Sequence, residues 1–340
     1  MNVHDSSMRT VSTDTLGVIA TIRQARRRGT VIVTTLSMAL MVVALVALAI
    51  GPVPIDPPTV AGILGDRLFA LGHGGWSDSV EQIVWTTRAP RVAMAMVAGA
   101  VLAVAGAMLQ AVVRNGLADP YLLGLNSGAS TGVAVVVLVA GGGSALLFSG
   151  AALAGAISAV LLVLLLAGAA NRRGPIRIVL AGLAVGYALN AMTSFLVFSS
   201  DSPEAARSVL FWLLGSLAAV QPLALAAAAV AAIVGIAVLV VIAPLTDALA
   251  SGDDSARSAG IDPERARLGL MVGVSAMVGG RHRLVLPVAA LLGAMLLVLA
   301  DTLARTAFAP QEIPVGVITG IIGAPFLLIL PRHTAPTASA

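Results

Sequence analysis

The stretch that decides the fold runs from Arg88 to Thr131, RAPRVAMAMVAGAVLAVAGAMLQAVVRNGLADPYLLGLNSGAST. Two arginines flank a proline at its start, and the next 22 residues, Val92 to Val113, carry no charge. At about 1.5 Å per residue, such a helix covers the roughly 30 Å of a bilayer's hydrocarbon core. A short polar turn follows at residues 115–120, and a second apolar segment comes after it. The stretch therefore predicts two membrane-spanning helices joined by an ordered turn.

The same stretch resembles the signature of the FecCD-type permeases, the membrane subunits of ABC importers for iron–siderophores, haem and cobalamin. In that family an R-x-P-R motif leads through a helix rich in glycine and alanine to R/E-N-P-L-A-D/E-P and then to G-x-x-x-G. One position departs from the pattern, because Gly116 stands where the family usually has a proline. The matching residues are Arg88, Pro90, Arg91, Asn115, Leu117, Ala118, Asp119, Pro120, Gly124 and Gly128.

The composition of the chain also indicates a protein embedded in a membrane. Of its 340 residues, 58% are hydrophobic and only 11% are charged, whereas a soluble domain carries about 25% charged residues. The net charge of +4 does not indicate nucleic-acid binding, because the arginines lie at the ends of apolar runs rather than in one patch. The expected fold is an all-α, polytopic bundle of transmembrane helices in the lipid bilayer.

All 20 basic residues are arginine, and the absence of lysine excludes several activities. A Walker-type phosphate loop, a Schiff base and the S-x-x-K hydrolase motif all need a lysine. There is no cysteine for a disulfide or a thiolate metal site, and the four histidines are scattered along the chain. We therefore expect no enzyme activity, metal or cofactor in this chain. Any transport energy must come from another subunit or an ion gradient.

Eight apolar runs are long enough to be read as full spans. Residues 1–29 are expected to form a cytoplasmic tail, loosely ordered over Met1 to Ile22, because four arginines precede the first run. A cleaved signal peptide is the alternative, but its apolar core would be about 7–15 residues. Residues 30–330 form one permease domain, and residues 331–340 a second cytoplasmic tail. The predicted spans are Thr30–Ile50, Val92–Val113, Tyr121–Val139, Ala145–Leu166, Ile178–Ser199, Pro222–Ala243, Leu284–Ala304 and Ile313–Leu330.

Two polar stretches are expected at the outer surface. Residues 51–87 read as a loop whose Trp76 and Trp85 favour the level of the lipid headgroups. Residues 201–207 read as a second outer loop, followed by a short interfacial helix around Trp212.

One segment is too short to span. Leu268 to Val278 is eleven apolar residues, which at about 1.5 Å each cover roughly half of the hydrocarbon core. The family has additional helices in this region, so the resemblance implies that about two dozen residues are missing after Val278. The family's usual ten spans then become eight plus one half-depth segment. If this segment does not cross, fifteen arginines lie inside and five outside; if it does, the numbers are thirteen and seven. The positive-inside rule favours the first arrangement.

The longest charged stretch of the second half is Pro244–Arg267, PLTDALASGDDSARSAGIDPERAR. The resemblance implies that this loop forms the coupling helices that dock in a cleft of the partner ATPase, which uses ATP and Mg. An ordinary solvated loop is the alternative. The residues expected at the coupling contact are Leu249, Ser251, Gly252, Arg257, Gly260 and Ile261.

Three arginines are expected at the outer end, against the positive-inside trend. From the residues alone, Arg88 and Arg91 read as interfacial anchors, and Arg305 as the partner of Asp301 in an i,i+4 ion pair. Near the end of its span, Asp301 is expected to be paired rather than to relay protons. The resemblance implies that the three arginines meet acidic residues on the two lobes of a substrate-binding protein, where exposed opposite charges steer docking. We expect this role for Arg88 and Arg91, and both interpretations stay open for Arg305.

Glycines recur at every fourth position in three predicted spans. Small residues at this spacing let helix backbones approach closely in lipid, so helix packing is the simpler interpretation. The alternative is that the first set, with the turn residues Asn115, Asp119 and Pro120, belongs to the translocation pathway. Asn190, in the middle of its span, is expected to bond a neighbouring helix. The glycines are Gly124, Gly128 and Gly132, Gly182 and Gly186, and Gly316 and Gly320.

These observations and the resemblance predict a cell-membrane permease subunit that moves a ferric siderophore into the cytoplasm, with cobalamin or haem as alternative cargoes. The implied partners are ABC ATPase subunits, an extracytoplasmic substrate-binding protein and a second permease copy or paralogue; no nucleic acid is implied. The shortened region leaves open a transport-inactive paralogue or an error in the sequence. A secondary transporter is disfavoured, because no unpaired acid lies convincingly at mid-membrane.

Overall fold

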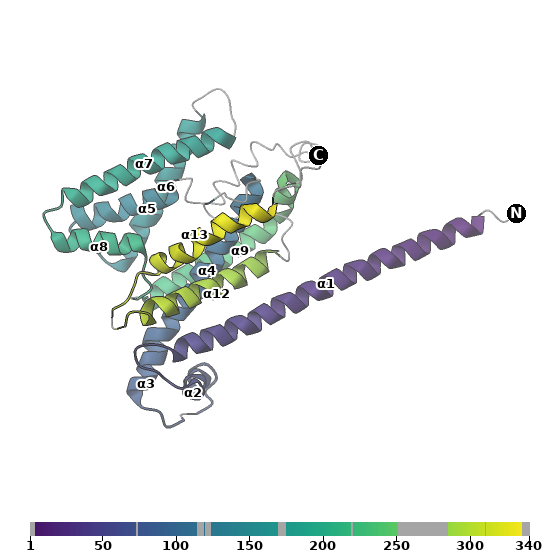
Figure 1. Cartoon of the computed structure of the whole chain (residues 1–340), viewed down its shortest axis with the longest axis horizontal. Coiled ribbons are helices and arrows are strands. Elements are labelled where there is room, and N and C mark those ends of the chain that lie inside the picture. Colours follow the sequence, from purple (N-terminus) through teal and green to yellow (C-terminus); the bar gives the residue numbers. More distant parts are fainter. Residues whose placement is uncertain are drawn as a thin grey trace.

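A computed structural model describes residues 4–72, 74–113, 119, 124–168, 175–218, 220–250, 285–309 and 311–334. All of the regular secondary structure in these ranges is helical (Figure 1), which confirms the predicted all-α class. Five helical segments are long and apolar enough to cross a membrane: Arg27–Ala49, Asp78–Gln110, Leu146–Ala167, Val179–Phe198 and Val285–Thr306. Three shorter apolar segments accompany them: Leu125–Val139, Pro222–Val238 and Val315–Phe326. Each of the eight predicted runs therefore contains a helix, but only five of these helices have the length of a full span within the described residues.

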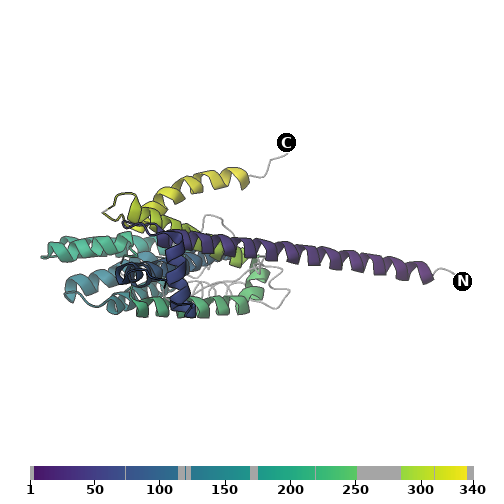
Figure 2. The same cartoon turned by 90° about the horizontal axis from the view of Figure 1, so that it is seen from below.

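The first helix, α1 (His4–Ala49), begins much earlier than the apolar run that it contains. The prediction of a loosely ordered tail was wrong from His4 onward. Residues 4–29 hold no proline, and their glycines are isolated, so nothing in the sequence ends a helix there. Figure 1 and Figure 2 show the N-terminal half of α1 extending well beyond the other helices.

The predicted loop 51–87 is also largely helical. Its first helix, α2 (Pro57–Phe69), lies across the end of α1 in both views (Figures 1 and 2). Asp56 caps this helix by accepting a hydrogen bond from the Thr59 backbone N–H at 3.3 Å, and prolines occupy the first turn. The hydrogen bonds from Thr59 lower the pKa of Asp56 below its usual value. This proline-rich N-cap signal was present in the sequence and was missed.

The second half of that loop leads directly into the first long span. Helix α3 (Asp78–Gln82) continues through the π-helical turn η1 (Ile83–Arg88) into α4 (Ala89–Val113). Pro90 lacks an N–H, and its ring would clash with the preceding turn of a regular helix. A wider π-helical turn directly before Pro90 accommodates this ring without ending the helix.

The remaining helices contain most of the predicted runs, with two departures: residues 244–250 of the predicted coupling loop continue a helix, and a helix begins at Pro203 inside the predicted outer loop 201–207. The predicted short helix around Trp212 is confirmed as α8. The bounds are α5 (Leu125–Ala134) with its π-helical extension η3 (Val135–Val139), α6 (Ala145–Gly168), α7 (Pro175–Phe198), α8 (Pro203–Leu214), α9 (Pro222–Ala250), α12 (Val285–Thr306) and α13 (Val315–Thr334).

Glycines lie at two close helix crossings. In the crossing of α5 and α6, a Cβ added at Gly128 or Gly132 would lie under 3.0 Å from the α6 backbone, and one at Gly155 would meet α5 in the same way. The close approach of the two backbones supports the packing interpretation of Gly128 and Gly132. Gly124 has a positive φ of 72° and caps the start of α5.

A second glycine pair, which the periodicity did not reveal, holds α4 against α12. A Cβ at Gly99 or Gly293 would collide with the backbone of the opposite helix. Gly316, in α13, approaches the carbonyl of Leu214 at the end of α8, whereas Gly320 has nothing within 4 Å of an added Cβ. The periodicity of glycine in this chain thus identifies some contact faces and misses others.

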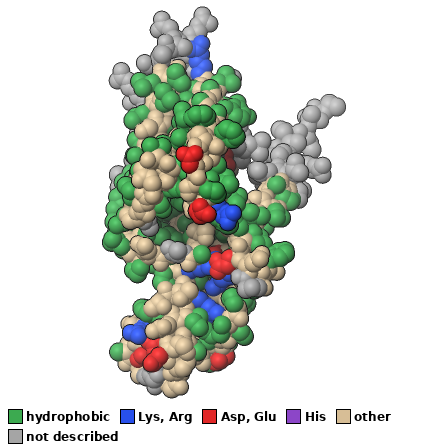
Figure 3. Space-filling model, turned by 90° about the vertical axis from the view of Figure 1, so that its left-hand side faces the viewer, with side chains coloured by type: hydrophobic (Ala, Val, Ile, Leu, Met, Phe, Trp, Pro, Cys, Tyr) green, Lys and Arg blue, Asp and Glu red, His purple; other side chains and the backbone are tan. Residues whose placement is uncertain are grey.

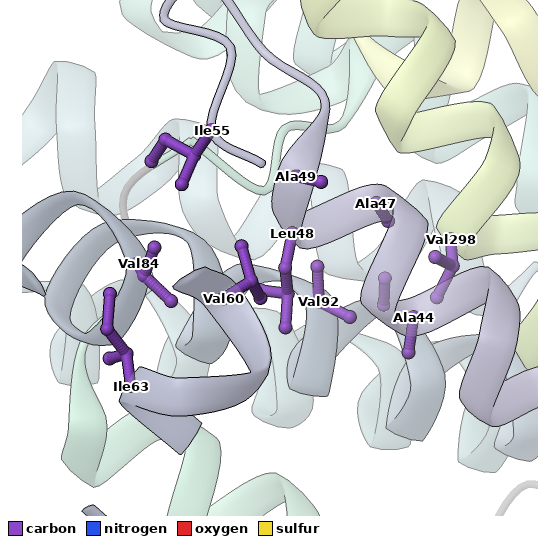
Figure 4. Close-up of a cluster of buried hydrophobic side chains, with 11 residues drawn as sticks. Ala44, Ala47, Leu48, Ala49, Ile55, Val60, Ile63, Val84, Val92 and Val298 are labelled. Atoms are coloured by element: carbon purple, nitrogen blue, oxygen red, sulfur yellow. The ribbon is translucent and has the colours of Figure 1, made fainter. Parts of the chain in front are cut away.

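A hydrophobic cluster closes the end of the bundle where α1 stops. It joins the last turns of α1 to α2, the start of α4 and α12 (Figure 4). Val60, Ile63 and Val84 are fully buried there. The cluster packs α2 against the bundle, and it positions the segments that carry the arginines discussed next. Its labelled members are Ala44, Ala47, Leu48, Ala49, Ile55, Val60, Ile63, Val84, Val92 and Val298.

Candidate functional site

Three arginines and two acids from distant parts of the chain meet where four helices begin or end. This arginine cluster consists of Arg88, Arg91, Asp301, Arg305 and Glu312. At this end of the bundle α1 stops at Ala49, α4 begins, α12 ends, and the chain turns back into α13. The same end is seen in Figure 3, where acidic and basic side chains lie next to one another on a surface that is otherwise mostly hydrophobic or neutral.

Arg91 is at the centre of the cluster and holds two carboxylates. Its Nε donates to both oxygens of Asp301, at 2.9 and 3.0 Å, and its Nη2 lies 2.9 Å from Asp301 Oδ1. Its Nη1 donates to both oxygens of Glu312 at 3.0 Å. The side chains of Arg91 and Asp301 are 8% and 1% exposed, whereas that of Glu312 is 40% exposed. The cluster therefore has a buried inner pair and one acid that faces solvent.

Arg88 and Arg305 cap the C-terminus of α1. Arg88 donates through Nη1 to the carbonyls of Leu48 and Ala49, at 2.6 and 3.1 Å, and through Nη2 to that of Val53 at 2.5 Å. Arg305 donates through Nη2 to the carbonyl of Ala47. The last carbonyls of a helix have no partner within it, and the helix dipole favours a cation there. The carbonyl of Ala49 also accepts from the Ile55 N–H at 3.1 Å, and the two arginines add hydrogen bonds to the other carbonyls at this helix end.

Gly51 makes room for the Arg88 cap. A Cβ at this position would lie 2.6 Å from Nη2 of Arg88. Any larger residue at position 51 would displace the guanidinium. This requirement was missed, because nothing in the local sequence links a glycine after α1 to an arginine 37 positions later.

Arg305 and Asp301 form the predicted i,i+4 ion pair, with Nε and Oδ2 3.8 Å apart. The prediction that Asp301 is paired is confirmed twice, since it also holds Arg91. Nε of Arg305 is nevertheless buried without a hydrogen-bond partner among the described residues. Within the cluster, then, Arg305 is the arginine whose hydrogen bonds are least satisfied.

The predicted docking role assumed that the three arginines are exposed, but in the structure all three are buried. Residue exposures are 5% for Arg88, 7% for Arg91 and 3% for Arg305. The assumption was wrong because each guanidinium turns inward to carbonyls or to Asp301, which compensates its burial. Docking itself stays a prediction, and it now has to account for this burial. Glu312 was not predicted as part of the site, although this acid lies in the same predicted turn as Arg305.

Several predicted residues lie wholly or partly outside the described part of the chain. Asp119 is described and exposed. Leu249 belongs to the last turn of α9, but nothing is described of its side chain. The half-depth segment 268–278 is likewise outside the described ranges. So are Asn115, Pro120, Ser251, Gly252, Arg257, Gly260 and Ile261.

A second notable surface runs along α7. Residues spaced three or four apart share one helix face, and on α7 the face of Leu183, Tyr187, Asn190, Ser194 and Phe198 is exposed throughout. Asn190 makes no hydrogen bond to another helix among the described residues of the single chain, so its bond to a neighbouring helix stays a prediction. We call these five residues the α7 stripe.

None of the described residues forms a metal-binding group. No three His, Asp or Glu side chains within the described ranges lie close enough together to hold a metal ion. The chemistry that the arginine cluster offers is recognition of carboxylates and stabilisation of helix ends.

Comparisons with known proteins agree with the fold and the sequence motifs. A model of the FecCD transport family matches residues 39–280 and 268–333. The vitamin B12 import system permease protein BtuC of Vibrio cholerae is 35% identical over 80% of this chain and 89% of that protein. The Fe(3+) dicitrate transport system permease protein FecD of Escherichia coli is 32% identical over 88% of this chain and 97% of that protein.

Two further matches extend this result. The hemin transport system permease protein HmuU of Yersinia pestis is 32% identical over 87% of this chain and 95% of that protein. A solved structure of a metal-chelate type ABC transporter in an inward-facing conformation has a TM-score of 0.73, with 24% identity, and covers 89% of this chain and 99% of that one. That likeness bears on the fold. From the family match and these relatives together, we conclude that the chain is a multi-pass membrane protein that belongs to the FecCD transport family of ABC-importer permeases.

Proposed function

We propose that this chain is the permease subunit of an ABC importer that moves a ferric siderophore, or a related metal chelate, into the cytoplasm. The observation that carries the proposal is the family match over residues 39–333. Relatives of similar identity are named for vitamin B12, hemin and Fe(3+) dicitrate. Each of these cargoes is a metal held by an organic chelator, so the shared chemistry supports a metal chelate as the cargo.

A second permease copy, or a paralogue, completes the pathway by covering the α7 stripe. Tyr187 and Phe198 are 68% and 88% exposed in the single chain, and Asn190 and Ser194 lie on the same face. An uncompensated polar side chain facing lipid in mid-membrane is unfavourable. A protein neighbour or a water-filled path would remove this cost. The exposure of this face supports a dimer around α7.

The other partners act at the two ends of the bundle. Separate ATPase subunits supply the energy at the cytoplasmic end, where the coupling loop 244–267 and the N-terminus lie in this proposal. A substrate-binding protein delivers the chelate at the end that carries the arginine cluster. The positive-inside count supports this orientation, since fifteen of the arginines fall on the proposed cytoplasmic side.

Uptake of a labelled ferric siderophore tests the proposal. Cells would carry this permease together with its ATPase and its binding protein, and control cells would lack the permease. We expect energy-dependent uptake above the control. Labelled cyanocobalamin and haemin are the parallel arms, and uptake of one of these alone would change the cargo without changing the class. No uptake in any arm would contradict an active importer.

A transport-inactive paralogue is the second candidate. The family model matches this chain in two pieces rather than one, and both pieces include residues 268–280. This interruption of the match lies next to the predicted missing block, and it favours the second candidate. The same uptake experiment separates the two candidates when a family-typical segment is restored after Val278. Uptake only after restoration would identify an inactive form.

A further inference from the structure

We propose that Glu312 is an internal substitute for a carboxylate of the docking partner, and that docking replaces Glu312 at Arg91. The partner is thus an extracytoplasmic protein that presents an acidic side chain to the arginine cluster. This inference rests on the proposed function, because it assumes that a binding protein docks at this end. Beyond that function, it explains how a buried arginine can take part in docking.

The first support is the asymmetry of the Arg91 guanidinium. Its Nε and Nη2 hold Asp301, whose side chain is almost completely buried, and its Nη1 holds the partly exposed Glu312. A partner cannot reach the inner pair without opening the bundle. It can reach the outer bond, because solvent already reaches Glu312. Exchange is therefore confined to one side of Arg91.

The second support is that the backbone beside Glu312 is held independently of its side chain. The N–H of Ile313 donates to the carbonyl of Ala304 at 3.0 Å, and the N–H of Val315 donates to that of Gly215 at 3.1 Å. These bonds fix the connection between α12 and α13. The side chain of Glu312 can therefore rotate away from Arg91 while the turn stays in place.

The third support is the charge balance of the cluster. It holds three arginines and two acids, so removing Glu312 changes its net charge from +1 to +2. A buried cation without a partner is costly, and Arg91 would then require a new anion. A carboxylate from a partner would restore both hydrogen bonds of Nη1, whereas a basic residue would add repulsion. The cluster thus selects an acidic partner surface.

The exchange of the Glu312 carboxylate for a carboxylate of the partner has a consequence for the free energy of docking. The bonds formed resemble the bonds broken, so the exchange gives selectivity and registration more than affinity, as is general for charges at interfaces. A permease without Glu312 should accept the partner's carboxylate without competition.

The test is Glu312→Gln, measured as binding of the substrate-binding protein to the purified permease. The binding protein is the one that supports uptake by the unmodified chain. The expected result is a several-fold gain in affinity, because the partner's carboxylate no longer competes with Glu312 for Arg91. Glu312→Ala should show the same gain, which separates loss of competition from any new bond made by glutamine.

The matched control is Glu204→Gln, which removes the same charge from an exposed acid in the first turn of α8 at the same end of the bundle. It should change affinity much less, because Glu204 forms no described ion pair with the cluster. Equal gains in both variants would indicate general electrostatics and overturn the exchange. Unchanged or weaker binding of Glu312→Gln would also overturn it, and weaker binding would mean that Glu312 itself meets a basic residue.

The outcome for the unmodified chain separates this inference from the proposed function. If the unmodified permease binds and transports but the Glu312 variants show no gain, the inference fails and the importer stands. If no binding protein supports binding or uptake, the proposed function fails and the inference fails with it.

Discussion

At the scale of single residues, the arginine cluster first of all holds helices together. Arg88 and Arg305 hydrogen-bond the last carbonyls of α1, and Arg91 joins α4 to α12 through Asp301. Arginine suits this arrangement because its planar guanidinium donates several hydrogen bonds in fixed directions and stays charged when buried. A lysine carries its three N–H donors on one nitrogen, so it lacks the planar fork that binds a carboxylate through two parallel hydrogen bonds.

We predict that Asp301→Asn strongly destabilises the protein. The substitution leaves Arg91 and Arg305 buried without their shared counter-charge, and breaking a buried ion pair from one side costs about 3–5 kcal/mol. The measurement is thermal unfolding of the purified permease in detergent. Asp201→Asn is the control, since this acid is exposed in the turn before α8, and it should unfold like the unmodified chain. A stable Asp301→Asn variant would mean that the buried pairing contributes little.

At the scale of helices, two crossings depend on the absence of side chains. The α5–α6 crossing requires Gly128, Gly132 and Gly155, and the α4–α12 crossing requires Gly99 and Gly293. Lipid provides no hydrophobic force between helices, so association there depends on close packing. A glycine on each side lets the backbones touch over a longer length.

We predict that Gly132→Val disrupts the α5–α6 crossing. A Cβ at this position would collide with the backbone carbonyl of Ala151, and overpacking of this kind typically costs about 1–3 kcal/mol. Gly150→Val is the matched control, because Gly150 lies on α6 with nothing within 4 Å of an added Cβ. The fraction of folded permease that survives heating, measured by size-exclusion chromatography, should fall for Gly132→Val alone. Equal behaviour of the two variants would contradict the packing.

At the scale of the whole molecule, the arginine cluster, α2 and α8 all lie toward one end of the bundle, and the N-terminal half of α1 extends from the other (Figure 1). In the proposed orientation the first end faces the binding protein and the second faces the cytoplasm. Recognition of the partner and support of the helix ends would then use the same residues.

We predict that residues at these two ends lie on opposite sides of the membrane. The chain contains no cysteine, so single cysteines can be introduced without removing any. An impermeant maleimide should label Gln311→Cys in intact spheroplasts, and Gln24→Cys only after permeabilisation. Both positions are exposed in the described structure. Labelling of Gln24→Cys from outside would reverse the proposed orientation.

The helical fold itself was readable from the sequence. A span in lipid must satisfy its backbone hydrogen bonds internally and present apolar side chains. Each apolar run therefore predicts a helix without information from distant parts of the chain. The helix around Trp212 and the Asp301–Arg305 pair were predicted for the same reason, because both depend on residues close together in sequence. The missed α2 is different, since its signal, Asp56 before two prolines, was local and was interpreted as loop.

What only the tertiary structure decided is which distant groups meet. Arg91 and Asp301 are 210 positions apart, and no local pattern connects them. Their pairing follows from the way α4 and α12 pack at Gly99 and Gly293. The same packing buries arginines that the sequence placed at an exposed surface. The lipid environment determines each helix locally, whereas the contacts between helices determine which charges are buried, which are paired and which remain accessible to a partner.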